Sequence, residues 1–231
     1  MGSYSDIQLH YIEQGVGQPL ILLHGNGESC DYFEHQMPCF STRFRVIAVD
    51  TRGHGQSPRG EKSFSIAQFA EDLHGFMDEQ GIAKTVLLGF SDGGNIALSF
   101  ALKYPERVDK MIVDGANLFP SGVKSRYQWP IELGYRIAKL FAKKSEQARK
   151  NAEMLGLMVN EPHIDPKELS KLTMPVLVVA GTKDMIKASH TRLIYESLPN
   201  AKLEIIEGDH FVAHKRAEDF NAAVLKFLSD F

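Results

Sequence analysis

The chain has 231 residues, of which 43% are hydrophobic and 24% charged, and this size and composition predict one globular domain over residues 1–231 with its own buried core. The formal net charge of −3 argues against nucleic acids and acidic membranes as partners, because both bind basic surfaces. The sequence shows no secretory signal pattern, and no apolar run reaches the roughly 20 residues that cross a bilayer. With only Cys30 and Cys39 available, we expect reduced thiols and a cytoplasmic protein.

Alternating strand and helix patterns run through most of the chain. Short apolar segments bounded by Gly, Asp or Pro predict buried parallel strands, at Leu20–Leu23, Val46–Val49, Thr85–Leu88, Met111–Val113, Val176–Ala180 and Leu203–Ile206. Between them, apolar residues return at the spacing of amphipathic helices, over Ile66–Gln80, Gly94–Tyr104, Ser189–Ser197 and Ala217–Phe231. This order predicts the α/β class, with a mostly parallel central sheet and helices on both faces.

The chain opens with a different kind of strand. Residues Ile7–Glu13 alternate apolar and polar side chains and lead into Gly15-Val16-Gly17. Alternation is typical of a strand with one solvent-facing side, and the glycines favour a tight turn. We therefore expect an antiparallel hairpin at the edge of the sheet, before the parallel core that starts at Leu20.

One segment interrupts the alternation. Residues 120–171 lack a strand pattern and carry an amphipathic helical pattern that includes Trp129. Aromatic and Met side chains at helical spacing are more often core than ligand contacts. Because this segment lies between two predicted sheet strands, we nevertheless expect a short helical lid, with Trp129 as a substrate contact. Its Lys and Arg residues are interpreted as a solvated helix face.

The strongest catalytic motif is Gly89-Phe90-Ser91-Asp92-Gly93. It follows a predicted strand directly and precedes a predicted helix, which is the context that a G-x-S-x-G nucleophile elbow requires. The tight turn leaves no room for side chains at the flanking positions, and Gly89 and Gly93 meet that condition. A helix N-terminus behind Ser91 favours the negative charge that develops in acyl transfer. We therefore predict that Ser91 is a nucleophile.

A serine hydroxyl needs a base, and the base needs an orienting acid. Two loops that follow predicted strands supply them: Val176–Ala180 leads to Asp184, and Leu203–Ile206 leads to His210. The carboxyl ends of parallel strands meet at the edge where open α/β sheets bind ligands. The order Ser91, Asp184, His210 is that of a catalytic triad behind an elbow, so we predict these three as catalytic.

These motifs resemble the α/β-hydrolase superfamily over nearly the whole chain. Residues 24–27, with the sequence HGNG, are similar to the family's oxyanion loop, and Asp50–Ser57 is similar to its D-x-R-G-x-G-x-S segment. The resemblance implies an α/β-hydrolase fold and an oxyanion hole made by the backbone N–H groups of Asn26 and Asp92. It also implies catalysis without a metal or an organic cofactor.

Three further histidines lie near these motifs: His24 in the oxyanion loop, His54 in the glycine-rich loop, and His214 four residues after His210. The resemblance implies structural roles for all three. His210 and His214 could share one helix face, but no nearby Asp, Glu or Cys pattern completes a zinc site. We therefore predict no metal.

The identity of the nucleophile narrows the chemistry. Dehalogenases and epoxide hydrolases of this fold carry aspartate at the elbow, so Ser91 favours an acyl-enzyme. The elbow with Asp92 and two glycines resembles the biphenyl-hydrolase-like branch, whose members cleave small esters, including amino-acid esters. The Asp92 carboxylate either binds a substrate amine or bonds nearby backbone N–H groups and stiffens the elbow, and both interpretations stay open.

Asp114 competes with Asp184 for the role of the acid. It directly follows the predicted strand Met111–Val113, and some relatives place their acid after that strand. The order of Asp184 and His210 behind the elbow favours Asp184.

These residues together predict a serine hydrolase that cleaves a small carboxylic ester, thioester or lactone through an acyl-enzyme. C–C bond cleavage in β-diketone-like compounds and cofactor-free perhydrolysis are alternatives on the same scaffold. A small-ligand receptor with a residual triad is the alternative outside the enzymes. We expect a small-molecule partner, and the sequence does not predict the oligomeric state.

Overall fold

A seven-stranded sheet in the order β1-β3-β2-β4-β5-β6-β7 forms the centre of the computed structural model, which describes residues 5–230. The strands are β1 (Tyr11–Gln14), β2 (Pro19–Leu23), β3 (Arg45–Val49), β4 (Thr85–Phe90), β5 (Val108–Asp114), β6 (Val176–Gly181) and β7 (Ala201–Ile206). Every neighbouring pair is parallel except β1 with β3. The predicted parallel core is therefore confirmed.

The N-terminal strand lies at the sheet edge, but the predicted hairpin is wrong. β1 pairs antiparallel with β3, with Tyr11 opposite Val49, and the following strand β2 lies on the far side of β3. Burial explains the order. Leu20–Leu23 are completely buried and occupy a central position between β3 and β4, whereas most side chains of β1 are exposed and suit an edge.

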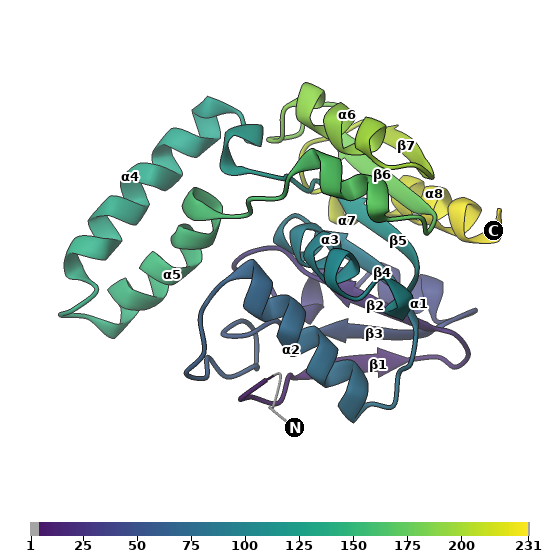
Figure 1. Cartoon of the computed structure of the whole chain (residues 1–231), viewed down its shortest axis with the longest axis horizontal. Helices are drawn as coiled ribbons and strands as arrows, with labels where there is room; N and C mark the ends of the chain where they lie inside the picture. The colour runs from purple at the N-terminus through teal and green to yellow at the C-terminus, as the bar shows by residue number, and fades with distance from the viewer. Residues whose placement is uncertain (1–4, 231) are drawn as a thin grey trace.

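Helices cover both faces of the sheet (Figure 1). One face carries α2 (Ile66–Glu79), α3 (Asp92–Lys103) and α6 (Ala188–Ser197), and the other carries α1 (Gln36–Phe40), α7 (Val212–Lys215) and α8 (Ala217–Ser229). Alternate strand residues supply the two cores: Ile21 and Leu87 face the first set, and Leu22 and Leu88 the second. The predicted helices are confirmed, although Phe231 lies outside the described residues. Short 3₁₀ helices are η1 (Cys30–Phe33) and η2 (Pro105–Arg107).

Residues 120–171, which we call the insertion, connect β5 to β6. They form η3 (Pro120–Gly122), α4 (Ser125–Phe141), α5 (Glu146–Asn160) and η4 (Pro166–Lys171). α4 and α5 lie side by side and project beyond the sheet, with α4 on the outside (Figure 1). Gly134 of α4 lies against Leu155 of α5, so the two helices approach closely there.

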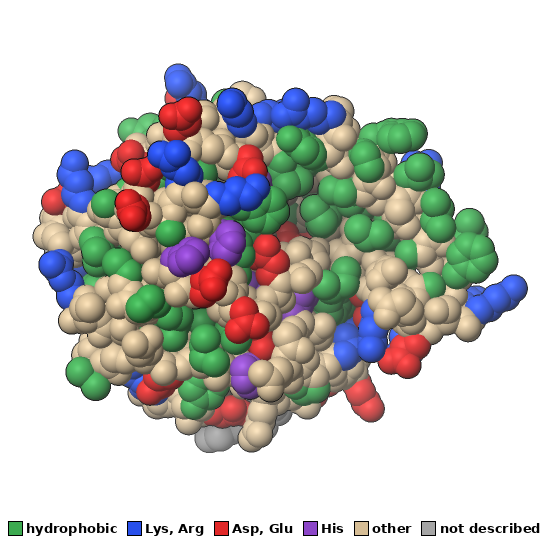
Figure 2. Space-filling view, turned by 180° about the vertical axis from the view of Figure 1, so that it is seen from behind, with side chains coloured by type: hydrophobic (Ala, Val, Ile, Leu, Met, Phe, Trp, Pro, Cys, Tyr) green, Lys and Arg blue, Asp and Glu red, His purple; other side chains and the backbone are tan. Residues whose placement is uncertain are grey.

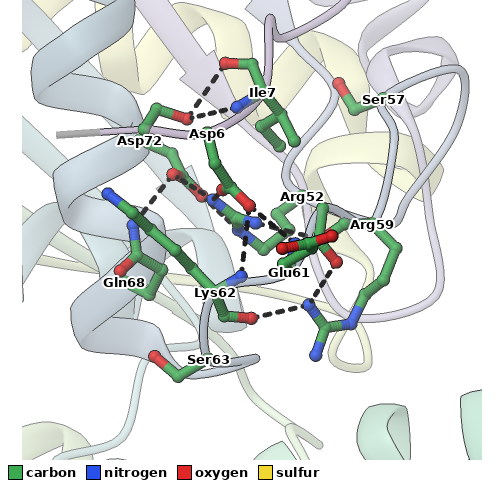
Figure 3. Close-up of polar contacts among 12 residues, drawn as sticks. Asp6, Ile7, Arg52, Ser57, Arg59, Glu61, Lys62, Ser63, Gln68 and Asp72 are labelled. Carbon is green, nitrogen blue, oxygen red and sulfur yellow. Dashed lines mark hydrogen bonds and ion pairs between the residues drawn. The ribbon is translucent and has the colours of Figure 1, made fainter. Parts of the chain in front are cut away.

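Arg52 ties the loop after β3 to two other parts of the fold (Figure 3). Its completely buried guanidinium donates two hydrogen bonds to Asp72 of α2, at 2.7 and 2.6 Å, and lies 2.6 Å from Asp6 Oδ1. The hydrogen bond from Arg52 holds the pKa of Asp6 well below its usual range. A buried charge is tolerated only when it is paired, so this arrangement depends on all three side chains.

We expect Arg52→Ala to lower the free energy of unfolding by about 3–5 kcal/mol, because it leaves the Asp72 carboxylate buried without a counter-charge. Urea unfolding followed by circular dichroism measures the loss. Arg45→Ala is the matched control, since its ion pair with Glu13 at 2.7 Å is partly exposed and should contribute about 1 kcal/mol or less. Equal losses in the two variants would contradict the structural role of Arg52.

Candidate active site

Ser91 lies on a tight turn between β4 and α3. Its backbone φ of 53° is the only positive value at a non-glycine position among residues 5–230. A Cβ atom at Gly93 would lie 1.9 Å from the carbonyl oxygen of Leu23, and one at Gly89 would lie 2.2 Å from that of Gly93. Only glycine fits where two backbone segments approach so closely. These close approaches at Gly89 and Gly93 hold Ser91 in its strained conformation.

The structure brings Ser91, His210 and Asp184 together from the loops after β4, β7 and β6. The distance from Ser91 Oγ to His210 Nε2 is 3.0 Å, and the distance from His210 Nδ1 to Asp184 Oδ1 is 2.7 Å. The side chains of His210 and Asp184 are buried, whereas Ser91 is half-buried. Such a chain can pass the serine proton to the imidazole and stabilise the resulting imidazolium.

Two backbone groups hold Asp184 in place besides His210. The Asp184 carboxylate accepts the N–H of Ile186 at 2.9 Å and the N–H of Gly181 at 3.3 Å. Burial raises the pKa of Asp184, but the hydrogen bond and charge of His210 and these two N–H groups outweigh it and hold the pKa below its usual value. As an anion, Asp184 can only accept, so His210 Nδ1 donates to it, and Nε2 of an uncharged ring can then accept from Ser91.

The backbone N–H groups of Asn26 and Asp92 both lie beside Ser91. Asp92 is the first residue of α3, and a Cβ at Gly25, which precedes Asn26, would lie 3.3 Å from Ser91 Cβ. Within residues 5–230, neither N–H donates a hydrogen bond to the protein. Two unpaired donors beside a nucleophile suit the oxyanion that forms in acyl transfer.

The Asp92 side chain is buried next to the elbow. Its Oδ1 accepts from Asn95 Nδ2 at 3.1 Å, and the same amide donates to Asn117 Oδ1 at 3.1 Å. Its Oδ2 has no hydrogen-bond partner among the described residues. Burial raises the pKa of Asp92 to about 6, against the opposing effect of the Asn26 and Asn95 amides. The bond to Asn95 fits a stiffening role, and an amine would have to reach the buried Oδ2 to bind there.

Asp114, the competing acid, has a different environment. It is completely buried at the end of β5, and neither carboxyl oxygen has a hydrogen-bond partner in the described part of the chain. Burial, and then the nearby charge of Asp184, raise the pKa of Asp114 well above its usual range. The structure therefore pairs His210 with Asp184 and not with Asp114, whose burial disfavours the charged form. The Asp114 carbonyl accepts the Ser91 N–H at 2.7 Å, which supports the elbow.

His24 and His54 join loops to each other rather than contacting the triad. His24 Nδ1 lies 2.7 Å from the carbonyl of Gly25, and its Nε2 accepts the N–H of Thr51 at 3.0 Å. Burial, and then the neighbouring His54, lower the pKa of His24 to about 4. His24 is therefore neutral near pH 7, and its two ring nitrogens connect the oxyanion loop to the loop after β3.

Two groups of side chains in the described part of the chain place three metal-ligand atoms within 4.8 Å of one another: His10, Cys30 and Asp50, and Glu34, His35 and His214. In the first group, Asp50 already accepts the backbone N–H groups of Cys30 and Gln56 and a contact from His10. The second group is mostly exposed. It contains His214 but not His210, so the predicted shared face of these two histidines is not a ligand set.

In the insertion, α5 contacts the oxyanion loop. Asn26 Nδ2 donates to the carbonyl of Met154 at 2.7 Å, and Arg59 pairs with Glu153 at 2.7 Å. These contacts fasten α5 to the loops on either side of β3, close to Ser91.

Trp129 lies away from the triad, so the structure does not support the predicted substrate contact. Its side chain is 67% exposed on α4. The cavity of about 420 Å³ that it lines also includes Pro120, Glu132 and Lys187 but no triad residue. Helical periodicity explains this position. Gly134 lies against Leu155 of α5, and Trp129, five positions earlier, is turned about 140° around the helix axis from Gly134.

Glu28 is a residue of the site that no sequence motif indicated. It follows the HGNG loop directly, and its Oε2 is buried without a hydrogen-bond partner among the described residues. Burial raises the pKa of Glu28 to about 7, and the charge of His210 acts in the opposite direction. A carboxyl that titrates near neutral pH therefore lies within electrostatic reach of His210. Its proximity to the HGNG loop is the sequence signal that could have identified it.

Known proteins of similar sequence share this architecture. The family model described as the alpha/beta hydrolase fold matches residues 18–158. The "Putative carbamate hydrolase RutD" of Caulobacter sp. (strain K31) is 32% identical over an alignment of 243 positions, gaps included, and the alignment covers 92% of this chain and 91% of that protein. The "Serine hydrolase BPHL" of Homo sapiens is 29% identical over an alignment of 245 positions, gaps included, and the alignment covers 96% of this chain and 83% of that protein.

A solved structure shows the same fold. The meta-cleavage product hydrolase from Pseudomonas fluorescens IP01 (CumD), solved as a variant complexed with acetates, superposes with a TM-score of 0.80 at 26% identity. The superposition covers 97% of this chain and 95% of that chain. Since the family model spans more than half of the sequence and a relative that is 32% identical is covered over nearly its whole length, the chain belongs to the alpha/beta hydrolase fold family.

Proposed function

We propose that the protein is a cytoplasmic serine hydrolase that cleaves a small carboxylic ester, thioester or lactone through an acyl-enzyme, without a cofactor. The observation that carries the proposal is the hydrogen-bonded chain at the elbow, with 3.0 Å from Ser91 Oγ to His210 Nε2 and 2.7 Å from His210 Nδ1 to Asp184 Oδ1. The names of the relatives given above support hydrolysis as the reaction. Because these names differ in substrate, the proposed scissile bond rests on the geometry of this site.

In the proposed acylation, Ser91 Oγ attacks the substrate carbonyl carbon while its proton passes to His210 Nε2. The carbonyl oxygen becomes an oxyanion, which the unpaired N–H groups of Asn26 and Asp92 stabilise at the start of α3. Asp184 balances the charge of the imidazolium. When the tetrahedral intermediate collapses, the bond to the leaving group breaks and His210 gives its proton to the departing oxygen or sulfur.

Deacylation repeats these steps with water as the nucleophile. His210 accepts a proton from water, the resulting hydroxide attacks the acyl carbon, and the carboxylic acid leaves as Ser91 recovers its proton. The insertion acts as a lid in this proposal, because α5 contacts Asn26 of the oxyanion loop through Met154. Exclusion of water around the acyl group strengthens the electrostatic stabilisation of the oxyanion.

C–C bond hydrolysis is the second candidate. It is favoured by the similarity to the meta-cleavage product hydrolase at 26% identity, which covers nearly the whole chain. A Ser-His-Asp chain can serve both reactions. They differ in the leaving group, which is a carbanion or enolate in C–C cleavage and an alkoxide or thiolate in ester or thioester cleavage.

A substrate panel tests the proposal. We expect p-nitrophenyl esters of short acids, thioesters or lactones to be hydrolysed with a higher kcat/KM than a β-diketone, because an alkoxide, phenolate or thiolate is a better leaving group than the carbanion or enolate that C–C cleavage releases. Product analysis by mass spectrometry identifies the broken bond. Turnover of the diketone alone would overturn the ester proposal in favour of C–C hydrolysis.

An amino-acid ester and its des-amino analogue extend the panel to Asp92. A preference for the amine that disappears in Asp92→Asn would assign this carboxylate to substrate binding, with about tenfold in kcat/KM for each 1.4 kcal/mol lost. Equal rates for both esters in the parent protein would leave Asp92 a structural residue of the elbow.

Replacement of the two candidate acids separates their roles. We expect Asp184→Asn to lower kcat by about 10⁴-fold, because an amide does not hold His210 with its Nδ1 protonated. Asp114→Asn is the matched control and should retain most of the turnover, since the Asp114 carboxyl oxygens have no hydrogen-bond partner, His210 included, among residues 5–230. The reverse ranking in variants whose circular dichroism matches that of the parent would transfer the role to Asp114.

A further inference from the structure

The outer face of α4 exposes a row of large apolar side chains. Its members recur at three- and four-residue intervals and therefore share one face of the helix; we call them the α4 stripe, and they are Trp129, Leu133, Ile137, Leu140 and Phe141. Their exposed fractions range from 44% at Leu133 to 77% at Leu140. Figure 2 shows hydrophobic side chains in a row along the edge that the insertion forms, with Lys or Arg at its tip.

Basic side chains accompany the stripe. Residues 124–150 contain eight Lys and Arg against two Glu, a formal charge of +6, in a chain whose net charge is −3. Arg136, Lys139, Lys143 and Lys144 are all exposed, and none of the four forms an ion pair with a carboxylate of residues 5–230. The net charge, which argued against an acidic membrane, therefore conceals a local excess of positive charge on the insertion.

The charge distinguishes between two occupants of this face. An exposed apolar row of this length is typical of an interaction site. In a two-fold dimer, the α4 stripe of one copy would face the same stripe of the other. Since Lys124 and Arg126 lie at one end of α4 and Lys143 and Lys144 at the other, parallel and antiparallel arrangements would both bring positive charges together. Like charges across an interface are destabilising, so charge disfavours a second copy. An anionic lipid bilayer has a negatively charged layer above an apolar interior. It therefore complements both the basic side chains and the apolar α4 stripe.

We propose that α4 docks the protein on an anionic lipid bilayer. In this arrangement the α4 stripe enters the boundary between headgroups and acyl chains, and the basic side chains lie at the lipid phosphates. Tryptophan suits such an interface because its ring is apolar and its N–H is polar. No helix among residues 5–230 is long and apolar enough to span a bilayer, and docking requires only that α4 lie parallel to the surface.

Docking on α4 leaves the proposed catalytic site close to the membrane. α5 packs between α4 and the oxyanion loop, to which it is bonded through Met154 and Asn26. The docking proposal does not rest on the proposed ester hydrolysis. Together, the two proposals favour substrates whose apolar chains partition into the bilayer.

The position of the only tryptophan gives a direct readout. Trp129 belongs to the α4 stripe, so its fluorescence should shift to shorter wavelength on vesicles that contain phosphatidylserine, and brominated acyl chains should quench it. The protein should co-sediment with these vesicles at low salt. Co-sedimentation should fall on pure phosphatidylcholine vesicles and at high salt, because the basic side chains then lose their electrostatic attraction.

Two double variants and a control locate the docking face. Leu140→Ser with Phe141→Ser should lower the partition coefficient on phosphatidylserine vesicles by about tenfold or more, since two apolar side chains no longer enter the bilayer. Lys143→Gln with Lys144→Gln should also lower it, and the decrease should disappear at high salt. Val16→Ser is the control, because Val16 is 83% exposed but precedes β2, outside the insertion. Its partition should equal that of the parent.

Near-ultraviolet circular dichroism and the midpoint of urea unfolding verify that each variant is folded. Failure of the parent protein to co-sediment with phosphatidylserine vesicles would overturn the proposal, as would equal partition of the parent and the Leu140→Ser, Phe141→Ser variant. A dimer in sedimentation velocity without lipid that this variant dissociates would assign the α4 stripe to self-association and would overturn it as well.

Discussion

The close approach of α3 to the end of β2 is the constraint on which the site depends. At Gly93, the second residue of α3, a Cβ atom would lie 1.9 Å from the carbonyl of Leu23, so the helix can start here only with glycine at that position. This start leaves Ser91 at a φ of 53°, and the Asp114 carbonyl holds its N–H from the neighbouring strand at 2.7 Å. Packing on both sides thus holds the strained backbone conformation of Ser91, and this conformation directs the Ser91 hydroxyl at His210.

The topology of the sheet then gathers the other groups. β4, β6 and β7 are parallel, so the loops that carry Ser91, Asp184 and His210 leave the same edge although Ser91 and His210 are separated by 119 positions. Within this small region, different environments shift the pKa values of two carboxyl groups in opposite directions. Hydrogen bonds hold the pKa of Asp184 below its usual value, whereas burial without partners raises the pKa of Asp114. This difference suits Asp184 to stay ionised beside the imidazole, and it makes Asp114 unsuited to take over that role.

Sequence predicted the parts of the structure that depend on local pattern. The buried strands, the elbow and the loops of Asp184 and His210 each have a short-range signature, and the structure brings these side chains together. The edge pairing of β1 was not predictable in this way, since it depends on competition with the fully buried β2 for a place beside β3. Glu28 and Trp129 depend on which face of a loop or helix packs inward, and one sequence does not contain that information.

The measurement that most directly tests the account is labelling with a fluorophosphonate probe, followed by peptide mapping. Only a base-activated hydroxyl attacks the phosphorus at a useful rate, so the account predicts one adduct, on Ser91, and neither labelling nor ester hydrolysis in a folded Ser91→Ala variant. A Ser63→Ala variant, which changes an exposed serine outside the site, should label like the parent. An adduct on another residue, or a Ser91→Ala variant that hydrolyses a p-nitrophenyl ester as fast as the parent, would contradict the nucleophile and with it the triad.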